Sequence, residues 1–136
     1  AAICLYLAER YPERGMLPPP GTPGRAATYQ WLFYAMTELE PPCAALSAER
    51  KKPEGERTAA AAEEARARFR KAAAALEPPL SRGEFLLGPA FTVADLVVGA
   101  ILSWARVLGA LEGLPATEAF LARVKERPAW KRALAD

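Results

Sequence analysis

The chain of 136 residues contains no histidine. Without an imidazole it cannot form a Ser/His/Asp triad, a Cys/His dyad, or a zinc or iron site that depends on histidine ligands. Only two cysteines occur, Cys4 and Cys43, which are too few for a four-cysteine metal site or a disulfide framework. Both lie in apolar, helix-like segments, so we expect buried, reduced thiols. The sequence therefore predicts no metal site.

The sequence also lacks a long hydrophobic run and an excess of charge of one sign. No apolar stretch reaches the roughly 18 residues of a membrane span, and no signal-peptide pattern opens the chain. The 18 basic and 16 acidic residues leave a net charge of +2. Basic residues gather at 50–52 and 66–71 with glutamates between them, which indicates a solvated helix face rather than a nucleic-acid surface. We expect a cytoplasmic protein with no membrane or nucleic-acid partner.

What is present favours one all-α domain. The chain is 51% hydrophobic and 25% charged, and at this length it can bury a core without disulfides or a metal. Alanine, leucine, glutamate and arginine dominate, which predicts helix nearly everywhere, and the 13 prolines and 9 glycines separate the segments. A proline-stiffened linker is predicted over 13–24. The expected helices are 1–10, 25–39, 43–50, 56–76, 93–108, 115–126 and 128–135.

Two pairs of prolines set boundaries in this prediction. Glu40-Pro41-Pro42 is expected to interrupt the aromatic-rich helix over 25–39, and Pro78-Pro79 is expected to end the long helix over 56–76. The pattern of that long helix predicts a buried side made of Ala62, Ala65, Phe69, Ala73 and Leu76. The helix over 93–108 is apolar almost all round and is expected at the centre of the bundle, where Gly99 allows a neighbour to approach closely.

The clearest local signal is the segment Phe91-Thr92-Val93-Ala94-Asp95-Leu96. Thr92 can cap the first free amides of the helix, and Asp95 at the third helical position can reach back to the Thr92 amide. Phe91 and Leu96 can pack as a hydrophobic staple around this turn. The segment therefore predicts a helix start with a capping box.

The sequence contains few arrangements of reactive groups. No pair of carboxylates has a spacing that indicates acid/base work, and the chain contains neither a dinucleotide-binding glycine motif nor a phosphate-binding loop. Cys43 follows two prolines at a predicted helix start, where the helix dipole favours a thiolate, but a core thiol explains it more simply. The residues alone predict a helical bundle with no catalytic residue.

Several motifs in their order resemble the carboxyl-terminal two thirds of a bacterial glutathione S-transferase. They are Tyr-Leu-Ala-Glu-Arg-Tyr-Pro at 6–12, Leu-Pro-Pro at 17–19, Gln-Trp-Leu at 30–32, Phe-Leu-Leu-Gly at 85–88, the capped segment 91–95, and Arg-Pro-Ala at 127–129. The resemblance implies a glutathione S-transferase C-terminal helical domain over 25–136, of about five to six helices. Residues 1–12 then correspond to the last helix of a thioredoxin-like domain, followed by the linker.

The same resemblance implies which residues meet ligands. Phe33, Tyr34, Thr37 and Glu40, with Trp104, match positions that wall the pocket for a hydrophobic electrophile, although core and interface packing is the favoured explanation for them. Glu38 matches an acidic residue that reaches the glutathione amino group across a dimer. Glu40 departs from the family, which often has histidine there beside a catalytic thiol. Thr92 and Asp95 are implied to be structural.

In such a family the thioredoxin-like domain supplies the catalytic residue and most glutathione contacts, and the chain is expected to begin just after the last of these. The resemblance thus implies a truncated detoxification enzyme, a homodimer in complete form, with glutathione as co-substrate but with no cofactor bound by this chain alone. An exposed apolar stripe is expected on 1–11. Two alternatives remain: a stand-alone protein-interaction module, and a helical bundle that binds small apolar molecules.

Overall fold

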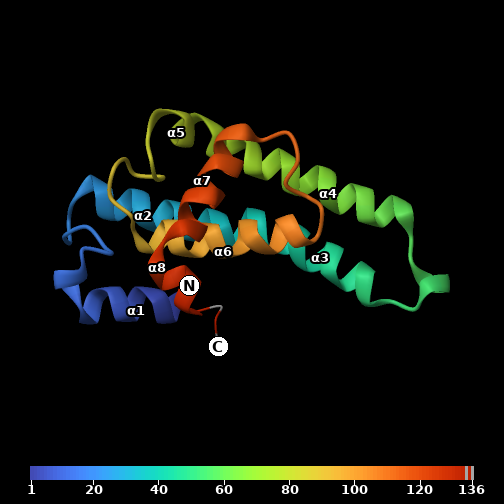
Figure 1. Ribbon diagram of the computed structural model, residues 1–136, viewed down its shortest axis with the longest axis horizontal. Helices are drawn as coiled ribbons and strands as arrows, with labels where there is room; N and C mark the ends of the chain where they lie inside the picture. The colour runs from blue at the N-terminus through green and yellow to red at the C-terminus, as the bar shows by residue number, and fades with distance from the viewer. Residues whose placement is uncertain (134, 136) are drawn as a thin grey trace.

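The computed structural model describes residues 1–133 and 135, and in them the chain forms helices and turns without a strand (Figure 1). The all-α prediction is therefore confirmed. The α-helices are α1 (Ala2–Arg10), α2 (Pro23–Tyr34), α3 (Glu40–Lys51), α4 (Ala59–Ala73), α5 (Glu77–Arg82), α6 (Val93–Val107), α7 (Pro115–Glu126) and α8 (Pro128–Ala133). A π-helical segment, η2 (Ala35–Leu39), joins α2 to α3, and short 3₁₀ turns lie at Pro12–Arg14, Glu54–Glu56 and Ala74–Leu76.

Helix α6 runs through the middle of the bundle, as its all-round apolar sequence predicts (Figure 1). Val98, Leu102 and Ala105 are fully buried, and α6 packs against α2 and α7. Helices α3 and α4 lie side by side and extend beyond α6. The predicted buried side of α4 is also confirmed: Ala65, Phe69, Ala73 and Leu76 are buried and Ala62 is partly buried.

Both predicted boundaries fall where the structure changes elements, after Leu39 and after Leu76, but the chain stays helical through each proline pair, so the predicted non-helical interruption is wrong. Pro41 and Pro42 occupy the first turn of α3, and Pro78 and Pro79 occupy the first turn of α5. A first turn needs no intrahelical amide donor, so proline is tolerated there. The preceding turns change their winding, to a π-turn before α3 and a 3₁₀ turn before α5, and the rings then fit without ending the helical path.

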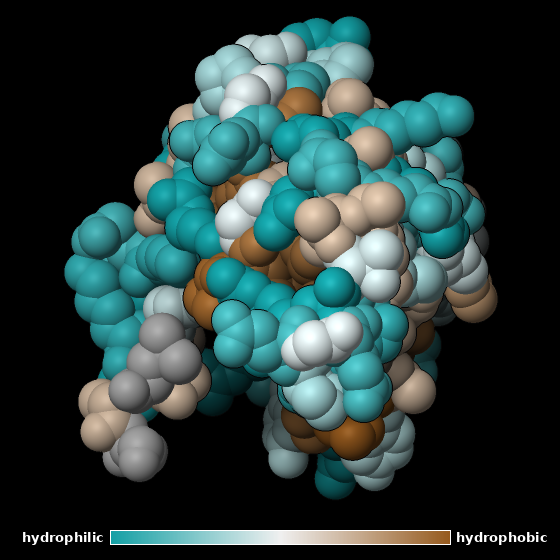
Figure 2. Space-filling view, turned by 90° about the vertical axis from the view of Figure 1, so that its right-hand side faces the viewer, coloured by the Kyte–Doolittle hydropathy of each residue, from teal (hydrophilic) through white to brown (hydrophobic). Residues whose placement is uncertain are grey.

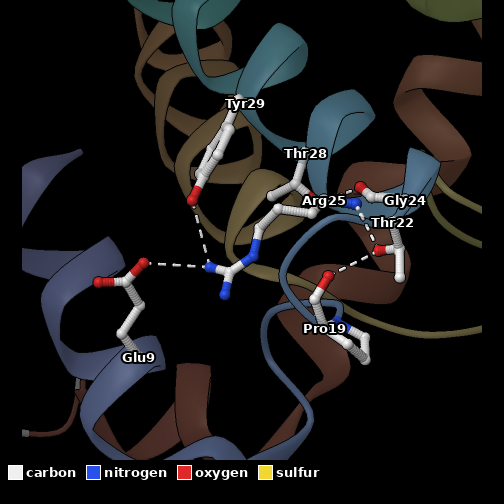
Figure 3. A network of polar contacts seen from close by, with 7 residues as sticks. All are labelled: Glu9, Pro19, Thr22, Gly24, Arg25, Thr28 and Tyr29. Carbon is white, nitrogen blue, oxygen red and sulfur yellow. Dashed lines mark hydrogen bonds and ion pairs between the residues drawn. The ribbon is translucent and has the colours of Figure 1, made fainter.

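Helix α1 and the linker are tied to α2 by a polar network (Figure 3). The Arg25 Nη1 atom donates to Glu9 Oε1 at 3.1 Å and to the Tyr29 hydroxyl at 3.3 Å. Thr22 caps α2, because its hydroxyl accepts from the Arg25 amide at 3.3 Å and donates to the Pro19 carbonyl at 2.7 Å. As a result α2 begins at Pro23, slightly earlier than predicted.

The end of the molecule where α3 and α4 meet is hydrophilic over most of its surface, with hydrophobic atoms at the bottom of a central hollow (Figure 2). The basic residues here and along α4 are partly neutralised: Lys52 pairs with Glu49, and both Arg66 and Arg70 pair with Glu63. None of the helices among the described residues is long and apolar enough to span a membrane.

Gly99 lies on the side of α6 that faces Val124 of α7. A Cβ atom added to it would lie 3.0 Å from Val124 Cγ1, which is tighter than most Cβ contacts, so the buried Val124 side chain would have to shift by a few tenths of an ångström. We expect Gly99→Ala to lower the free energy of unfolding by about 1 kcal/mol, because overpacking outweighs the gain in helix propensity. In a Val124→Ala background, which removes both methyl groups, the same substitution should instead stabilise the protein by roughly 0.5 kcal/mol.

Urea denaturation of the two single variants and the double variant measures this reversal of sign. Stabilisation by Gly99→Ala in the presence of Val124 would contradict the close approach of α6 and α7.

Candidate functional site

The start of α6 holds a buried, hydrogen-bonded polar cluster. Thr92 and Asp95 form the predicted capping box, and Asp95 is fully buried. Its carboxylate accepts from the Thr92 amide at 2.8 Å, from the Thr92 hydroxyl at 2.9 Å and from the Leu86 amide at 2.9 Å. Burial raises the pKa of Asp95, although these hydrogen bonds act in the opposite direction. The cluster has no access to solvent, which is consistent with the structural role implied by the sequence.

The predicted staple residues lie beside this cap. Phe91 and Leu96 line one apolar cavity of about 410 Å³, together with Val124 and Trp130. The Phe91 ring meets the Phe85 ring edge-on at 5.3 Å, and the Arg127 guanidinium lies 3.7 Å from its centroid. The linker reaches the same place, since the Val93 amide donates to the Met16 carbonyl at 2.8 Å. The start of α6 is thus where the linker and α7 meet.

Three of the predicted ligand-contact residues come together around one polar cavity. Tyr34, Thr37 and Glu38, at the end of α2 and in η2, form one wall, and α4 forms the other; the cavity measures about 310 Å³. The Tyr34 hydroxyl donates to the Ala72 carbonyl at 2.9 Å. Burial raises the pKa of Tyr34, and the nearby negative charge of Glu38 raises it further. The Thr37 hydroxyl donates within its own helix, to the Phe33 carbonyl at 3.0 Å.

Phe33 lies elsewhere, although it is next to Tyr34 in the chain. Successive residues of a helix point about 100° apart, so Phe33 turns away from the polar cavity. Its side chain is 71% exposed and lines a separate apolar cavity of about 270 Å³ between α1 and α2, with Leu5 and Met36 among its neighbours. The predicted pocket wall is therefore divided between two faces of the continuous helical segment formed by α2 and η2.

Glu40 and Trp104 line neither of these two cavities. Trp104 is partly buried on α6 and packs against the core. Glu40 is partly buried in the first turn of α3 and acts on Cys43, one turn further along. Both residues remain candidates from the family resemblance alone.

Cys43 is a core thiol. It is free and buried, and burial together with the negative charge of Glu40 raises its pKa to about 12. Because the thiolate is the reactive form, we expect Cys43 to remain unlabelled by a disulfide reagent at pH 8 until the protein unfolds. Partly exposed Cys4 should account for the labelling of the native protein, and Cys4→Ser should remove it. Rapid labelling of native Cys4→Ser protein would contradict this assignment.

Helix α1 has one face in the core and one in solvent. Ala8 is buried, whereas Ile3 is 75% exposed, Tyr6 is 66% exposed, and Leu7 and Tyr11 are about half exposed. The exposed apolar stripe expected on this segment is confirmed. Leu7 and Tyr11 also border an apolar cavity of about 320 Å³ that reaches Val93 and Leu96 on α6. Large contiguous apolar surfaces of this kind mark interaction sites in proteins.

The bundle with its central capped helix α6, preceded by a helix with an apolar outer stripe, defines a helical domain of the glutathione transferase type. Residues 26–128 match the family described as glutathione S-transferase, C-terminal domain, and the chain belongs to this family.

Similar proteins agree with this assignment. Glutathione S-transferase GstA of Escherichia coli O157:H7 is 33% identical over 134 residues, which cover 98% of this chain and 64% of GstA. The ternary complex of BphK, a bacterial glutathione transferase, superposes with a TM-score of 0.86 at 26% identity, over 98% of this chain and 64% of BphK. A sphingomonad glutathione S-transferase complexed with glutathione superposes with a TM-score of 0.84 at 27% identity, over 98% of this chain and 64% of that protein. The chain thus spans slightly less than two thirds of these relatives.

Proposed function

We propose that this chain is the helical part of a glutathione transferase that joins glutathione to hydrophobic electrophiles. A thioredoxin-like unit, with which the chain acts, supplies the group that activates the glutathione thiol. Family membership supports the reaction class, and the glutathione complex of the sphingomonad relative supports the co-substrate. The main support for assigning thiol activation to a separate thioredoxin-like unit is the exposed apolar stripe of α1, on a chain that spans 64% of GstA.

In this proposal residues 1–12 are the last helix of the thioredoxin-like unit, and the rest of that unit covers the stripe. Ile3, Tyr6, Leu7 and Tyr11 offer both aliphatic and aromatic surface to it. Burial of apolar side chains stabilises such a contact by about 25 cal/mol per Å². The Arg25–Glu9 ion pair joins α1 to α2 (Figure 3).

The electrophile pocket uses the apolar face of α2, on which Phe33 is the most exposed aromatic residue. Glu38 accepts from the amino group of glutathione held by the partner subunit of a homodimer. Its exposed position on η2 suits contact with a molecule outside the chain. No residue of this chain is assigned to activation of the thiol, because Cys43 is buried and protonated and histidine is absent.

A chimera tests the proposal. The part of GstA that this chain does not match is joined ahead of the chain, and conjugation of 1-chloro-2,4-dinitrobenzene to glutathione is measured. We expect turnover, and we expect Phe33→Ser to raise KM for the electrophile with little change in KM for glutathione. Val107→Ser is the matched control, since Val107 is also 71% exposed but lies at the end of α6. A folded chimera without turnover would contradict the proposal.

The same exposed stripe favours a second candidate, a stand-alone module that docks on another protein. In that case the chimera is folded but inactive, and Leu7→Glu abolishes a complex with a protein that is not a thioredoxin-like unit.

A further inference from the structure

A cavity of about 470 Å³ lies where α1, the linker and the first turn of α2 meet. Its walls are largely proline rings, from Pro12 after α1 and from positions 18–20 of the linker. Two charged side chains also line it, Glu9 of α1 and Arg25 of α2. In the part of the chain that the structure describes, it shares no lining residue with the apolar cavity beside Phe33. Its volume falls in the range of small-molecule sites, about 300–1,000 Å³.

The guanidinium of Arg25 uses one of its three nitrogens for hydrogen bonds within the described residues. Nη1 donates to both Glu9 and the Tyr29 hydroxyl, and Figure 3 shows both dashed lines ending on this one atom. Nε is buried and has no acceptor among the residues that the structure describes. The Arg25 side chain is only 12% exposed. Because buried donors in folded proteins are nearly always paired, an orphaned Nε points to an acceptor from outside the chain.

The geometry of the guanidinium selects the acceptor. Nε and Nη2 form one edge of the planar group, and the N–H groups of this edge point in parallel. A carboxylate matches such an edge with two hydrogen bonds, whereas a single carbonyl oxygen fills it only in part. Glu9 binds at Nη1, and its side chain is 54% exposed, so water screens its negative charge. Arg25 can therefore hold a second carboxylate while Glu9 stays in place.

The walls select the rest of the ligand. Proline has no amide hydrogen, so the rings at 12 and 18–20 offer apolar surface without donors. Further charged oxygens of a phosphate or sulfate would lose their hydration against these rings. The Glu9 carboxylate also repels a dianion more strongly than a monoanion. A single carboxylate on an apolar body satisfies both the edge of Arg25 and the walls.

We propose that this cavity binds a small monocarboxylate with an apolar body, such as an aromatic acid, through the Nε–Nη2 edge of Arg25. Such a ligand contacts α1, the linker and α2 together. Neither glutathione nor a thioredoxin-like unit is needed for this binding. The site is therefore independent of the proposed transferase function and is tested on the chain alone.

Benzoate is the probe, and the side-chain Nε–Hε signal of Arg25 in ¹⁵N-labelled protein is the readout. This signal is assigned through bonds from the Arg25 backbone amide. We expect a saturable downfield shift of the Hε proton on titration with benzoate. Benzamide, which offers one neutral oxygen, and acetate, which lacks the apolar body, should each bind at least about threefold more weakly. Inorganic phosphate should produce no saturable shift.

Two variants should act in opposite directions. Arg25→Lys keeps the positive charge but has no two-donor edge, so it should weaken benzoate binding by at least about threefold, followed through the backbone amides of Ala8 and Leu17. Glu9→Gln removes the negative charge beside Arg25 and keeps an acceptor for Nη1, so it should strengthen binding by about threefold. Glu13→Gln, which removes a carboxylate that does not line the cavity, is the matched control and should change nothing.

The absence of a saturable Hε shift with benzoate would overturn the inference and assign Nε to a bound water. Weaker binding in Glu9→Gln, or equal binding of acetate and benzoate, would also overturn it. The Glu9→Gln variant keeps the test decisive if Arg25→Lys does not fold, because it retains the hydrogen bond between α1 and Arg25.

Discussion

Asp95→Ala lowers the free energy of unfolding by about 3 kcal/mol, because it leaves buried donors without an acceptor and removes the cap of the central helix. The Asp95 carboxylate accepts three hydrogen bonds at 2.8–2.9 Å, from the backbone and side chain of Thr92 and from the Leu86 amide. All of them lie in the interior. Urea denaturation followed by circular dichroism measures the loss, which is a large part of the stability of a domain of this size.

Asp95→Asn is the control for this prediction. It keeps one acceptor oxygen and introduces no buried charge, so the loss should be smaller than that of Asp95→Ala. An effect below about 1 kcal/mol for Asp95→Ala would mean that the cap contributes no more than a typical exposed N-cap.

Glu77→Ala lowers the free energy of unfolding by about 2 kcal/mol, because the Glu77 carboxylate caps α7 from a different helix. The helix itself offers no capping side chain at Leu114, and Pro115 has no amide hydrogen. Glu77 accepts from the Ala116 amide at 3.1 Å, from the Thr117 amide at 2.7 Å and from the Thr117 hydroxyl at 2.6 Å. Urea denaturation measures the effect.

The pH dependence separates a charged cap from simple packing. Burial raises the pKa of Glu77, but the hydrogen bonds from Thr117 and Ala116 outweigh it and leave the pKa below its ordinary value. Such a group stabilises the fold above the unfolded-state pKa and loses this contribution as pH falls through the folded-state pKa. The difference between wild type and Glu77→Ala should therefore shrink in acid. Glu118→Ala, which removes a carboxylate from the first turn of α7 but none of these hydrogen bonds, should have a much smaller effect at neutral pH.

Features that depend on residues close in sequence could be predicted. The capping box at Thr92 and Asp95 uses two residues of one turn, and the burial of α6 follows from its apolar composition. The consequences of the proline pairs could not be predicted from local rules, because a proline that stops one helix also suits the first turn of the next. The winding of the turn before the prolines differs between the two places, π before α3 and 3₁₀ before α5.

Contacts between distant segments were missed for a related reason. The Glu77–Thr117 cap joins positions 40 residues apart, and its only local signal is the absence of a capping side chain at Leu114. Arg68 and Lys71 have the sequence context of a solvated helix face, and only the position of α4 beside η2 places them opposite Glu38. In the same way, the predicted pocket wall was divided because Phe33 and Tyr34 face different neighbours.

The proposed function makes this chain the helical part of a transferase and assigns none of the thiol-activating chemistry to its residues. The most direct measurement is the initial rate of conjugation of glutathione to 1-chloro-2,4-dinitrobenzene by the purified chain alone, over a range of both substrates. We expect a rate no higher than that of the uncatalysed reaction. A rate that saturates with glutathione and with the electrophile would contradict this expectation, because the helical domain would then hold a catalytic group of its own.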